Sequence, residues 1–144
     1  MKTFILFVFL SLQIQEPNWL LDFEQAKSEA KSHDKLIILN FAGSDWCGPC
    51  IKMTRDIFNQ EPFIGYATEH LALIRADFPR SKKNQLDPQQ TKHNEALAEK
   101  YNPTGKFPLT LLLDANGKVL KTWDGFKEGT PQTFIKEIEQ KIGG

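Results

Sequence analysis

The sequence predicts an α/β fold in which helices cover both faces of a mixed central sheet. Two continuous apolar runs, residues 35–43 and 71–78, are typical of strands buried on both faces. Segments with apolar residues at helical spacing separate these runs, and strands joined through helices are expected to run parallel. Towards the C-terminus, two further apolar runs meet at an Asp-Ala-Asn-Gly turn. This arrangement predicts that the last two strands form an antiparallel hairpin.

The elements of the first half follow from the spacing of apolar residues. Leu20, Leu21, Phe23, Ala26 and Ala30 fall on one stripe, which predicts a helix over residues 19–35. The strand over residues 35–43 then breaks at a Gly-Ser-Asp sequence. A second helix is expected after residue 47 and should end near residue 61, because the proline that follows disfavours helix in the residue before it.

The second half begins, after the strand over residues 71–78, with a polar stretch. Residues 79–94 are rich in Lys and Gln and are expected to form a long excursion, followed by a short helix over residues 95–101. Strands are expected at 109–113 and 119–123. The last helix should begin at Thr130, whose side chain can cap it, with Pro131 at the first helical position.

The length and composition fit one globular domain. The chain has 144 residues, of which 40% are hydrophobic and 11% aromatic, which is enough for one packed core. Its 18 Lys and Arg balance its 18 Asp and Glu, giving a formal net charge of zero. Nucleic-acid-binding domains usually carry an excess of positive charge, so no nucleic-acid partner is expected. We expect the protein to be a monomer.

The first 15 residues have a different character. Lys2 precedes the run Phe4–Leu12, in which Ser11 is the one polar residue. This run is too short to cross a bilayer, which takes about 20 apolar residues, but it is typical of a secretory signal peptide. We therefore expect residues 1–15 to be a signal peptide and residues 16–144 to be an exported domain, periplasmic or otherwise extracytoplasmic, with no stable membrane span. An N-terminal strand and an uncleaved anchor are the alternatives, and the protein would be cytoplasmic if the stretch is not a signal.

The chain has two cysteines, Cys47 and Cys50, both in the sequence SDWCGPC at residues 44–50. Such a pair can be a redox pair, half of a zinc site, a stabilising bridge or a coincidence. A bridge across two intervening residues closes a very small loop and stabilises the fold little. A zinc site normally needs four ligands, and His33, His70 and His93 have no metal-ligand spacing from the cysteines. We therefore expect no metal, and surface positions for the three histidines.

A redox pair fits the position of the cysteines best. Cys47 is expected at a helix N-terminus, where unpaired N–H groups and the helix dipole favour an anion. The thiolate is the attacking species, and a free cysteine with a pKa of about 8.5 is only a few per cent ionised at pH 7. Cys50, one turn further on, is expected to lie deeper. Pro49 suits the first helical turn, and Gly48 lets another backbone approach closely.

These residues resemble the active site of the thioredoxin superfamily. Trp46, Cys47, Gly48, Pro49 and Cys50 match the family motif residue for residue. The sequence FPLTLLLDANGKVL resembles the family's cis-proline loop and last hairpin. The resemblance covers about residues 18–142 and implies a thioredoxin-like fold. Within the superfamily, the sequence is similar to exported disulfide reductases and isomerases.

The resemblance implies a protein thiol–disulfide oxidoreductase. Cys47 would attack a substrate disulfide and Cys50 would release the product, with the cysteine pair as the redox carrier and no other cofactor. The partners would be proteins with disulfides or thiols, and a redox partner that recycles the pair. Trp46, Phe107 and Pro108 would contact an extended substrate segment. The peptide bond between Phe107 and Pro108 is expected to be cis, the alternative being an ordinary trans bond.

Two positions depart from the family pattern. Thioredoxins commonly bury an acidic residue beneath the second cysteine, and the nearest counterpart here is Asn40. Because an amide cannot take up a proton, deprotonation of Cys50 is hypothesised to rely on water or on Asp45. Alternatively, Asn40 only satisfies backbone groups in the core. The strand over residues 71–78 lacks the lysine known in some thioredoxins, and Arg75, its nearest basic residue, is expected to be solvated.

Other functions are compatible with the sequence. The same fold can serve as a non-catalytic binding, chaperone or metal-delivery module. A thiol peroxidase is less favoured, because such sites usually surround the attacking cysteine with Thr and Arg. Arg80, Lys82 and Lys83 in the polar stretch are expected to be solvated, the alternative being a docking surface for an acidic partner.

Overall fold

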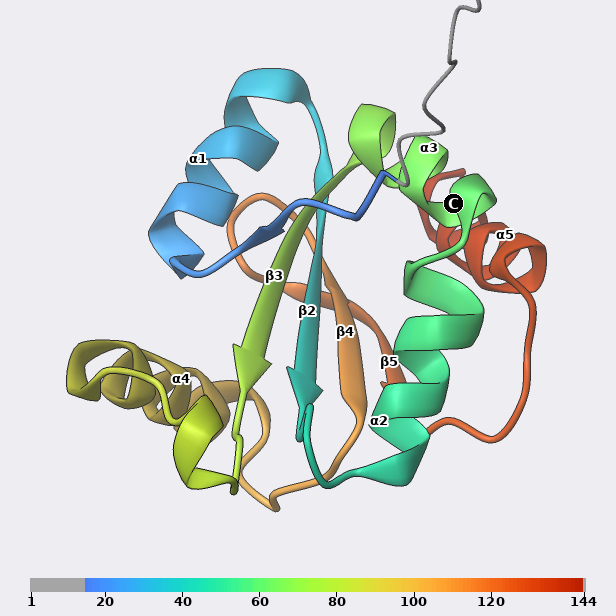
Figure 1. Ribbon diagram of the computed structural model, residues 1–144. Helices are drawn as coiled ribbons and strands as arrows, with labels where there is room; N and C mark the ends of the chain where they lie inside the picture. Colours follow the sequence, from blue (N-terminus) through green and yellow to red (C-terminus); the bar gives the residue numbers. More distant parts are fainter. Residues whose placement is uncertain (1–14, 144) are drawn as a thin grey trace, which may run out of the picture.

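A five-stranded mixed sheet forms the centre of the computed structural model, which describes residues 15–143 (Figure 1). The expected signal peptide falls almost wholly outside the described residues. The strand order is β1-β3-β2-β4-β5; β1 and β2 each pair with β3 in parallel, whereas the β2–β4 and β4–β5 pairs are antiparallel. The mixed sheet and its C-terminal hairpin are therefore confirmed. The strands are β1 Trp19–Leu20, β2 Leu36–Ala42, β3 Leu71–Asp77, β4 Leu109–Leu113 and β5 Val119–Asp124.

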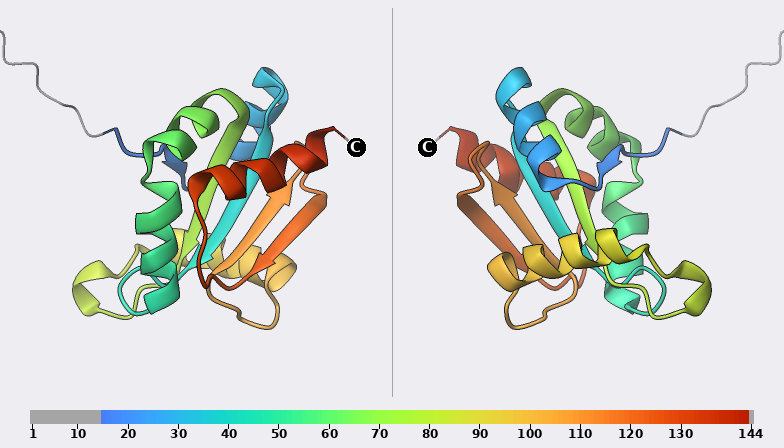
Figure 2. Two further views of the ribbon diagram at one scale, coloured as in Figure 1. Left: turned by 90° about the vertical axis from the view of Figure 1, so that its right-hand side faces the viewer. Right: turned by 90° about the vertical axis from the view of Figure 1, so that its left-hand side faces the viewer.

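Helices cover both faces of this sheet (Figure 2). One face packs against α1 and α4, and the other against α2, its π-helical continuation η1, α3 and α5. A short 3-10 turn, η2, lies between β3 and α4. The predicted α/β class is thus confirmed. The helices are α1 Phe23–His33, α2 Gly48–Met53, η1 Thr54–Phe58, α3 Glu61–His70, η2 Lys82–Asn84, α4 Pro88–Tyr101 and α5 Pro131–Ile142.

The central strand β2 has a core on each side. Successive side chains of a strand point to opposite faces, so Ile37 and Leu39 join the core beneath α1 and α4, while Ile38 joins the other core. All three are fully buried. This burial fixes the direction of β2, and therefore the place where the chain leaves the sheet and reaches the cysteines.

Side-chain caps set the starts of three helices. Asp22 accepts a hydrogen bond from the backbone of Gln25 at the start of α1, and Asp87 caps α4 in the same way. Thr130 caps α5, with Pro131 at its start, as the sequence predicts.

The first helix starts later than the apolar stripe predicts. Trp19 and Leu20 form the edge strand β1, paired with β3, and Leu21 is 59% exposed. The reason is the cap at Asp22, which starts the helix at Phe23 and excludes the residues before it.

Two further helical segments differ from the prediction. The helix α3 was not predicted from the sequence. Pro62 lies in the first turn of α3, where a missing N–H is tolerated. The proline therefore begins this helix as well as separating it from the helical segment before it. The polar stretch 79–94 is not a loop throughout, because α4 begins at Pro88. Within residues 15–143, no helix is both long enough and apolar enough to cross a membrane.

Candidate active site

The cysteines lie at the junction between β2 and α2. Cys47 is the N-cap residue of α2, and its Sγ accepts a hydrogen bond from the backbone N–H of Cys50 at 3.3 Å. Pro49 lies in the first turn, and the helical path continues through η1 to Phe58. The chain thus places the Cys47 sulfur at the N-terminal end of a helix, as predicted.

Cys47 and Cys50 form a disulfide, with their Cα atoms 5.2 Å apart. The two residues are 5% and 3% exposed, so the expected difference in depth is small in this oxidised form. Trp46 and Phe107 pack against the pair and cover it. Gly48, between the two cysteines in the sequence, is exposed.

Trp46 is held in place on three sides. Its Nε1 donates to the backbone oxygen of Phe78 at 2.7 Å, and its ring meets that of Phe107 edge to face at 5.5 Å. A Cβ added to Gly43 would lie 2.3 Å from the indole, so the close approach of the ring depends on glycine at this position. The indole is therefore a fixed wall beside the disulfide.

The loop before β4 forms a second wall, which contacts the first through the ring of Phe107. The peptide bond between Phe107 and Pro108 is cis, as expected from the resemblance. Pro108 is buried, and its backbone oxygen accepts a hydrogen bond from Gly125 at 2.9 Å. By contrast, the backbone N–H and C=O of Phe107 have no hydrogen-bond partner among residues 15–143. These two groups can pair with an extended chain laid along the site.

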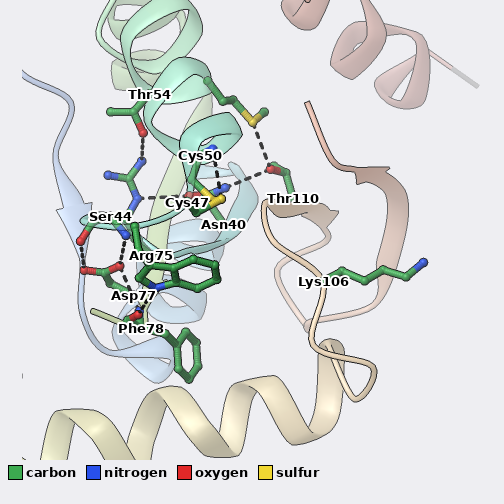
Figure 3. The surroundings of a disulfide bond; sticks show 12 residues. Asn40, Ser44, Cys47, Cys50, Thr54, Arg75, Asp77, Phe78, Lys106 and Thr110 are labelled. Carbon is green, nitrogen blue, oxygen red and sulfur yellow. Dashed lines mark hydrogen bonds between the residues drawn. A yellow bond between two sulfur atoms is a disulfide. The ribbon is translucent and has the colours of Figure 1, made fainter. Parts of the chain in front are cut away.

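A polar network lies beneath Cys50 (Figure 3). Arg75 donates from Nε to Asn40 Oδ1 at 3.1 Å and from Nη2 to Thr54 Oγ1 at 3.2 Å. Asn40 in turn donates to Thr110 Oγ1 at 3.1 Å. The parallel register places Asn40 directly beside Arg75, which brings the amide and the guanidinium together.

Arg75 was expected to be solvated. This expectation is wrong, because the guanidinium donates to protein groups. Its guanidinium lies 4.1 Å from the ring of Trp19, and burial lowers the pKa of Arg75 to about 10. The side chain still carries its charge at neutral pH. Among residues 15–143 no carboxylate forms an ion pair with it, so its partners are neutral oxygens and an aromatic face.

A cavity of about 510 Å³ opens on the same side of the disulfide. Cys50, Arg75, Thr54 and Ser44 are among the residues that line it. Most of the lining is apolar, but the cavity is open to solvent, and the side chains of Arg75, Thr54 and Ser44 give it polar groups to which water can bind. Cys50 therefore has a route to solvent that does not pass Cys47.

Asp45 points away from the cysteines and anchors the following loop. Its carboxylate accepts hydrogen bonds from the backbone of Arg80 and of Ser81, both at 2.9 Å, and from Asn84 Nδ2 at 3.1 Å. These bonds, led by that from Arg80, hold the pKa of Asp45 below its usual value. A lowered pKa makes Asp45 a weaker base, so this geometry gives it an anchoring role and argues against the proton relay considered from the sequence.

In the part of the chain from residue 15 to residue 143, no three His, Cys, Asp or Glu side chains gather closely enough to hold a metal ion. His93 is half-buried, and its Nε2 accepts a hydrogen bond from the backbone of Phe23 at 3.1 Å, at the start of α1. No sequence signal indicated this contact, because 70 residues separate the two partners.

Comparison with known proteins shows which class this fold and site define. The family described as "Thioredoxin-like domain" matches residues 23–142, and the chain belongs to that family. Together with its disulfide-forming cysteine pair, this membership makes the protein a thiol–disulfide oxidoreductase.

Two proteins of Chlamydia pneumoniae are similar to this chain in sequence. The disulfide bond reductase DsbH of Chlamydia pneumoniae is 34% identical over 120 residues, which cover 83% of this chain and 70% of that protein. The thioredoxin-related protein DsbJ of the same organism is 25% identical over 95 residues, which cover 66% of this chain but 26% of DsbJ.

Solved structures agree with this assignment. A structure of the DsbH oxidoreductase has a TM-score of 0.80 at 30% identity and covers 99% of this chain and 95% of its own. The oxidised C-terminal domain of Neisseria meningitidis DsbD has a TM-score of 0.56 at 23% identity, covering 81% and 90%. This second likeness shows the shared fold.

Proposed function

We propose that this protein reduces disulfide bonds in exported proteins through Cys47 and Cys50. The observation that carries the proposal is the placement of the Cys47 sulfur at the N-cap of α2, where the backbone N–H of Cys50 donates to it. Such a donor and the helix dipole stabilise a thiolate. The similarity to a protein named as a disulfide bond reductase supports the reducing direction.

The first step is attack by the Cys47 thiolate on one sulfur of the substrate disulfide. The substrate S–S bond breaks, a mixed disulfide forms between Cys47 and the substrate, and the other substrate sulfur leaves as a thiolate that takes a proton from water. No metal, flavin or nucleotide takes part, because the cysteine pair carries both electrons.

The second step closes the disulfide of the enzyme. Cys50, as a thiolate, attacks the Cys47 sulfur, and the second substrate sulfur is released as a thiol. The proton of Cys50 passes to water in the cavity that this residue lines, since Asn40 cannot accept it and Asp45 points elsewhere. The enzyme ends in the disulfide form and needs an external dithiol partner for the next cycle.

Substrate binding uses the two walls of the site. An extended substrate segment pairs with the free backbone groups of Phe107, beside Pro108, and packs against Trp46. Main-chain hydrogen bonds bind a segment whatever its side chains, which suits an enzyme with several protein substrates.

Export is part of the same proposal. Residues 1–15 act as a signal peptide, and the domain from residue 16 works outside the cytoplasm as a monomer. The charge and apolar run of this segment support the proposal. Expression of the full chain in a bacterial host, followed by mass measurement of the periplasmic product, tests it: an exported product lacking the leader is expected, and retention of the full chain in the cytoplasm would contradict it.

The reductase activity is tested by insulin reduction with dithiothreitol. Wild-type protein is expected to accelerate the turbidity that follows cleavage of the insulin disulfides, while Cys47→Ser removes the acceleration. Pre-reduced Cys50→Ser, mixed with insulin after removal of dithiothreitol, is expected to accumulate the mixed disulfide, visible as a covalent adduct on a non-reducing gel. Identical traces with and without the protein would favour the non-catalytic binding module instead.

A further inference from the structure

The segment after β3 carries charge that the proposed function does not use. Residues 79–86 contain Arg80, Lys82 and Lys83 and no carboxylate. The turn η2 within this segment lies at the same end of the molecule as the start of α2 (Figures 1 and 2). The segment is therefore a positively charged rim close to the disulfide.

Arg80 is the residue of this rim that contacts Trp46, the aromatic side chain packed against the disulfide. The central carbon of its guanidinium lies 3.6 Å from the ring centroid of Trp46, and the same indole also contacts the ring of Phe107. The guanidinium covers the indole on one side, and the residue remains exposed. Within residues 15–143 it forms no ion pair and no side-chain hydrogen bond, so its N–H donors are free to meet a ligand.

The position of Arg80 is fixed by its own backbone. Asp45, next to Trp46 in the sequence, accepts hydrogen bonds from the N–H groups of Arg80 and Ser81 and from the Asn84 side chain. An anchored loop and a stacked side chain lose little conformational entropy when a partner binds. The rim is thus a preorganised binding site for an anionic group of a partner.

The carboxylates around the rim are already engaged. Asp45 accepts the three loop hydrogen bonds, Asp77 accepts two from Ser44, and Asp124 pairs with Lys106. None of them forms an ion pair with Arg80. Asp45 and Asp77 keep their negative charge, since their donors are neutral, but the three cationic side chains of the rim outnumber them, and the guanidinium of Arg80 is the charge stacked on Trp46 beside the disulfide.

We infer that Arg80 selects substrates, favouring segments that carry Asp or Glu beside the disulfide to be reduced. The inference rests on the proposed function, because it names the substrate class of the same site. A substrate carboxylate meets the guanidinium while the neighbouring backbone pairs with Phe107. Complementary charges of this kind raise the association rate and reject like-charged partners.

The test uses three disulfide-bonded peptides that differ only in the two residues flanking one cysteine, which are Glu, Gln or Lys. Pre-reduced protein is mixed with each peptide at low salt, and the second-order rate constant is measured by quenching and chromatography. Wild type is expected to reduce the Glu peptide about two- to fivefold faster than the Lys peptide. Arg80→Gln should bring this ratio close to one, and Arg80→Lys should keep most of it.

Lys141→Gln is the matched control, since it removes the same charge from the exposed end of α5. Lys141→Gln is expected to leave the ratio of the Glu and Lys peptide rates unchanged. If Lys141→Gln and Arg80→Gln lowered this ratio equally, net charge alone would set the rate, and the inference would be overturned. Equal wild-type rates for all three peptides would also overturn it while leaving the proposed function intact. Failure to reduce even the Gln peptide would contradict the proposed function itself.

Discussion

Asn40 links the two halves of the polar network beneath Cys50, and its removal should destabilise the protein. Substituting Asn40→Leu keeps the branched shape of the side chain but leaves Arg75 Nε without its acceptor and removes the hydrogen bond that Thr110 Oγ1 accepts. When a buried donor loses its acceptor, the free energy of unfolding falls by about 1–3 kcal/mol. Urea denaturation is expected to show a loss of this size, with Asn40→Asp, which keeps the acceptor, losing less. An unchanged midpoint in Asn40→Leu would mean that the network is not stabilising.

Gly43 allows the indole of Trp46 to lie close to the backbone. Gly43→Ala places a Cβ 2.3 Å from the ring and should displace it, at a cost of about 1–3 kcal/mol of overpacking, with a shift in tryptophan fluorescence. Gly65→Ala is the control: in α3 a Cβ meets nothing within 4 Å, so this variant is expected to gain up to about 1 kcal/mol. Matching fluorescence in Gly43→Ala and wild type would refute the account of Trp46.

The positions of some single residues could be predicted from the sequence and those of others could not. The difference is the separation along the chain between each residue and the residues it contacts. Cys47 is placed by local pattern alone, because a strand followed by a capped helix is encoded within about ten residues. The contact of Asn40 with Arg75 is different, since it depends on the register between two strands 35 residues apart. The pairing of His93 with Phe23 depends on how two helices dock, which no local pattern reveals.

At the scale of elements, the loop that follows β3 should respond to acid through Asp45. Its pKa is lowered in the folded protein, so its hydrogen bonds stabilise the loop above the ordinary value of 3.8 and are lost as the pH falls through the lower folded value. An NMR titration should show the amide protons of Arg80 and Ser81 shifting with a midpoint below 3.8. A midpoint at or above 3.8 would show that the carboxylate does not hold the loop.

The errors in helix boundaries share a physical origin. Pro62 was interpreted as the end of a helix, yet proline both ends one helix and suits the first turn of the next, and the sequence pattern alone does not separate these roles. The polar residues of α4 hid a helix because only Asn94 and Leu97 are buried along its 14 residues. A helix with so narrow a buried face gives a weak periodic signal.

For the whole molecule, the fold class and the class of site were predictable because several local signals agree. Buried apolar runs, helical stripes and the hairpin turn all indicate one mixed sheet, and the cysteine pair falls where its central strand ends. The cavity beside Cys50 and the half-buried charge of Arg75 were not predictable, since both arise only when β3, α2 and η1 come together.

The direction of electron flow is a property of the whole molecule, and it can be measured. If the protein is a reductase, its cysteine pair should equilibrate with glutathione buffers at a potential nearer the value of about −270 mV typical of thioredoxin than the value of about −120 mV typical of a strong oxidant. A potential close to the second value would make the protein an oxidase with the same residues.

The central claim is that the fold gives Cys47 an acidic thiol, and titration of that thiol tests it most directly. The Cys50→Ser variant leaves one cysteine and keeps the backbone N–H that donates to its sulfur. Thiolate absorbance at 240 nm, followed against pH, should give a pKa for Cys47 within about 3.5–7.5, below the value of about 8.5 for free cysteine. A pKa of about 8.5 or higher would contradict the account.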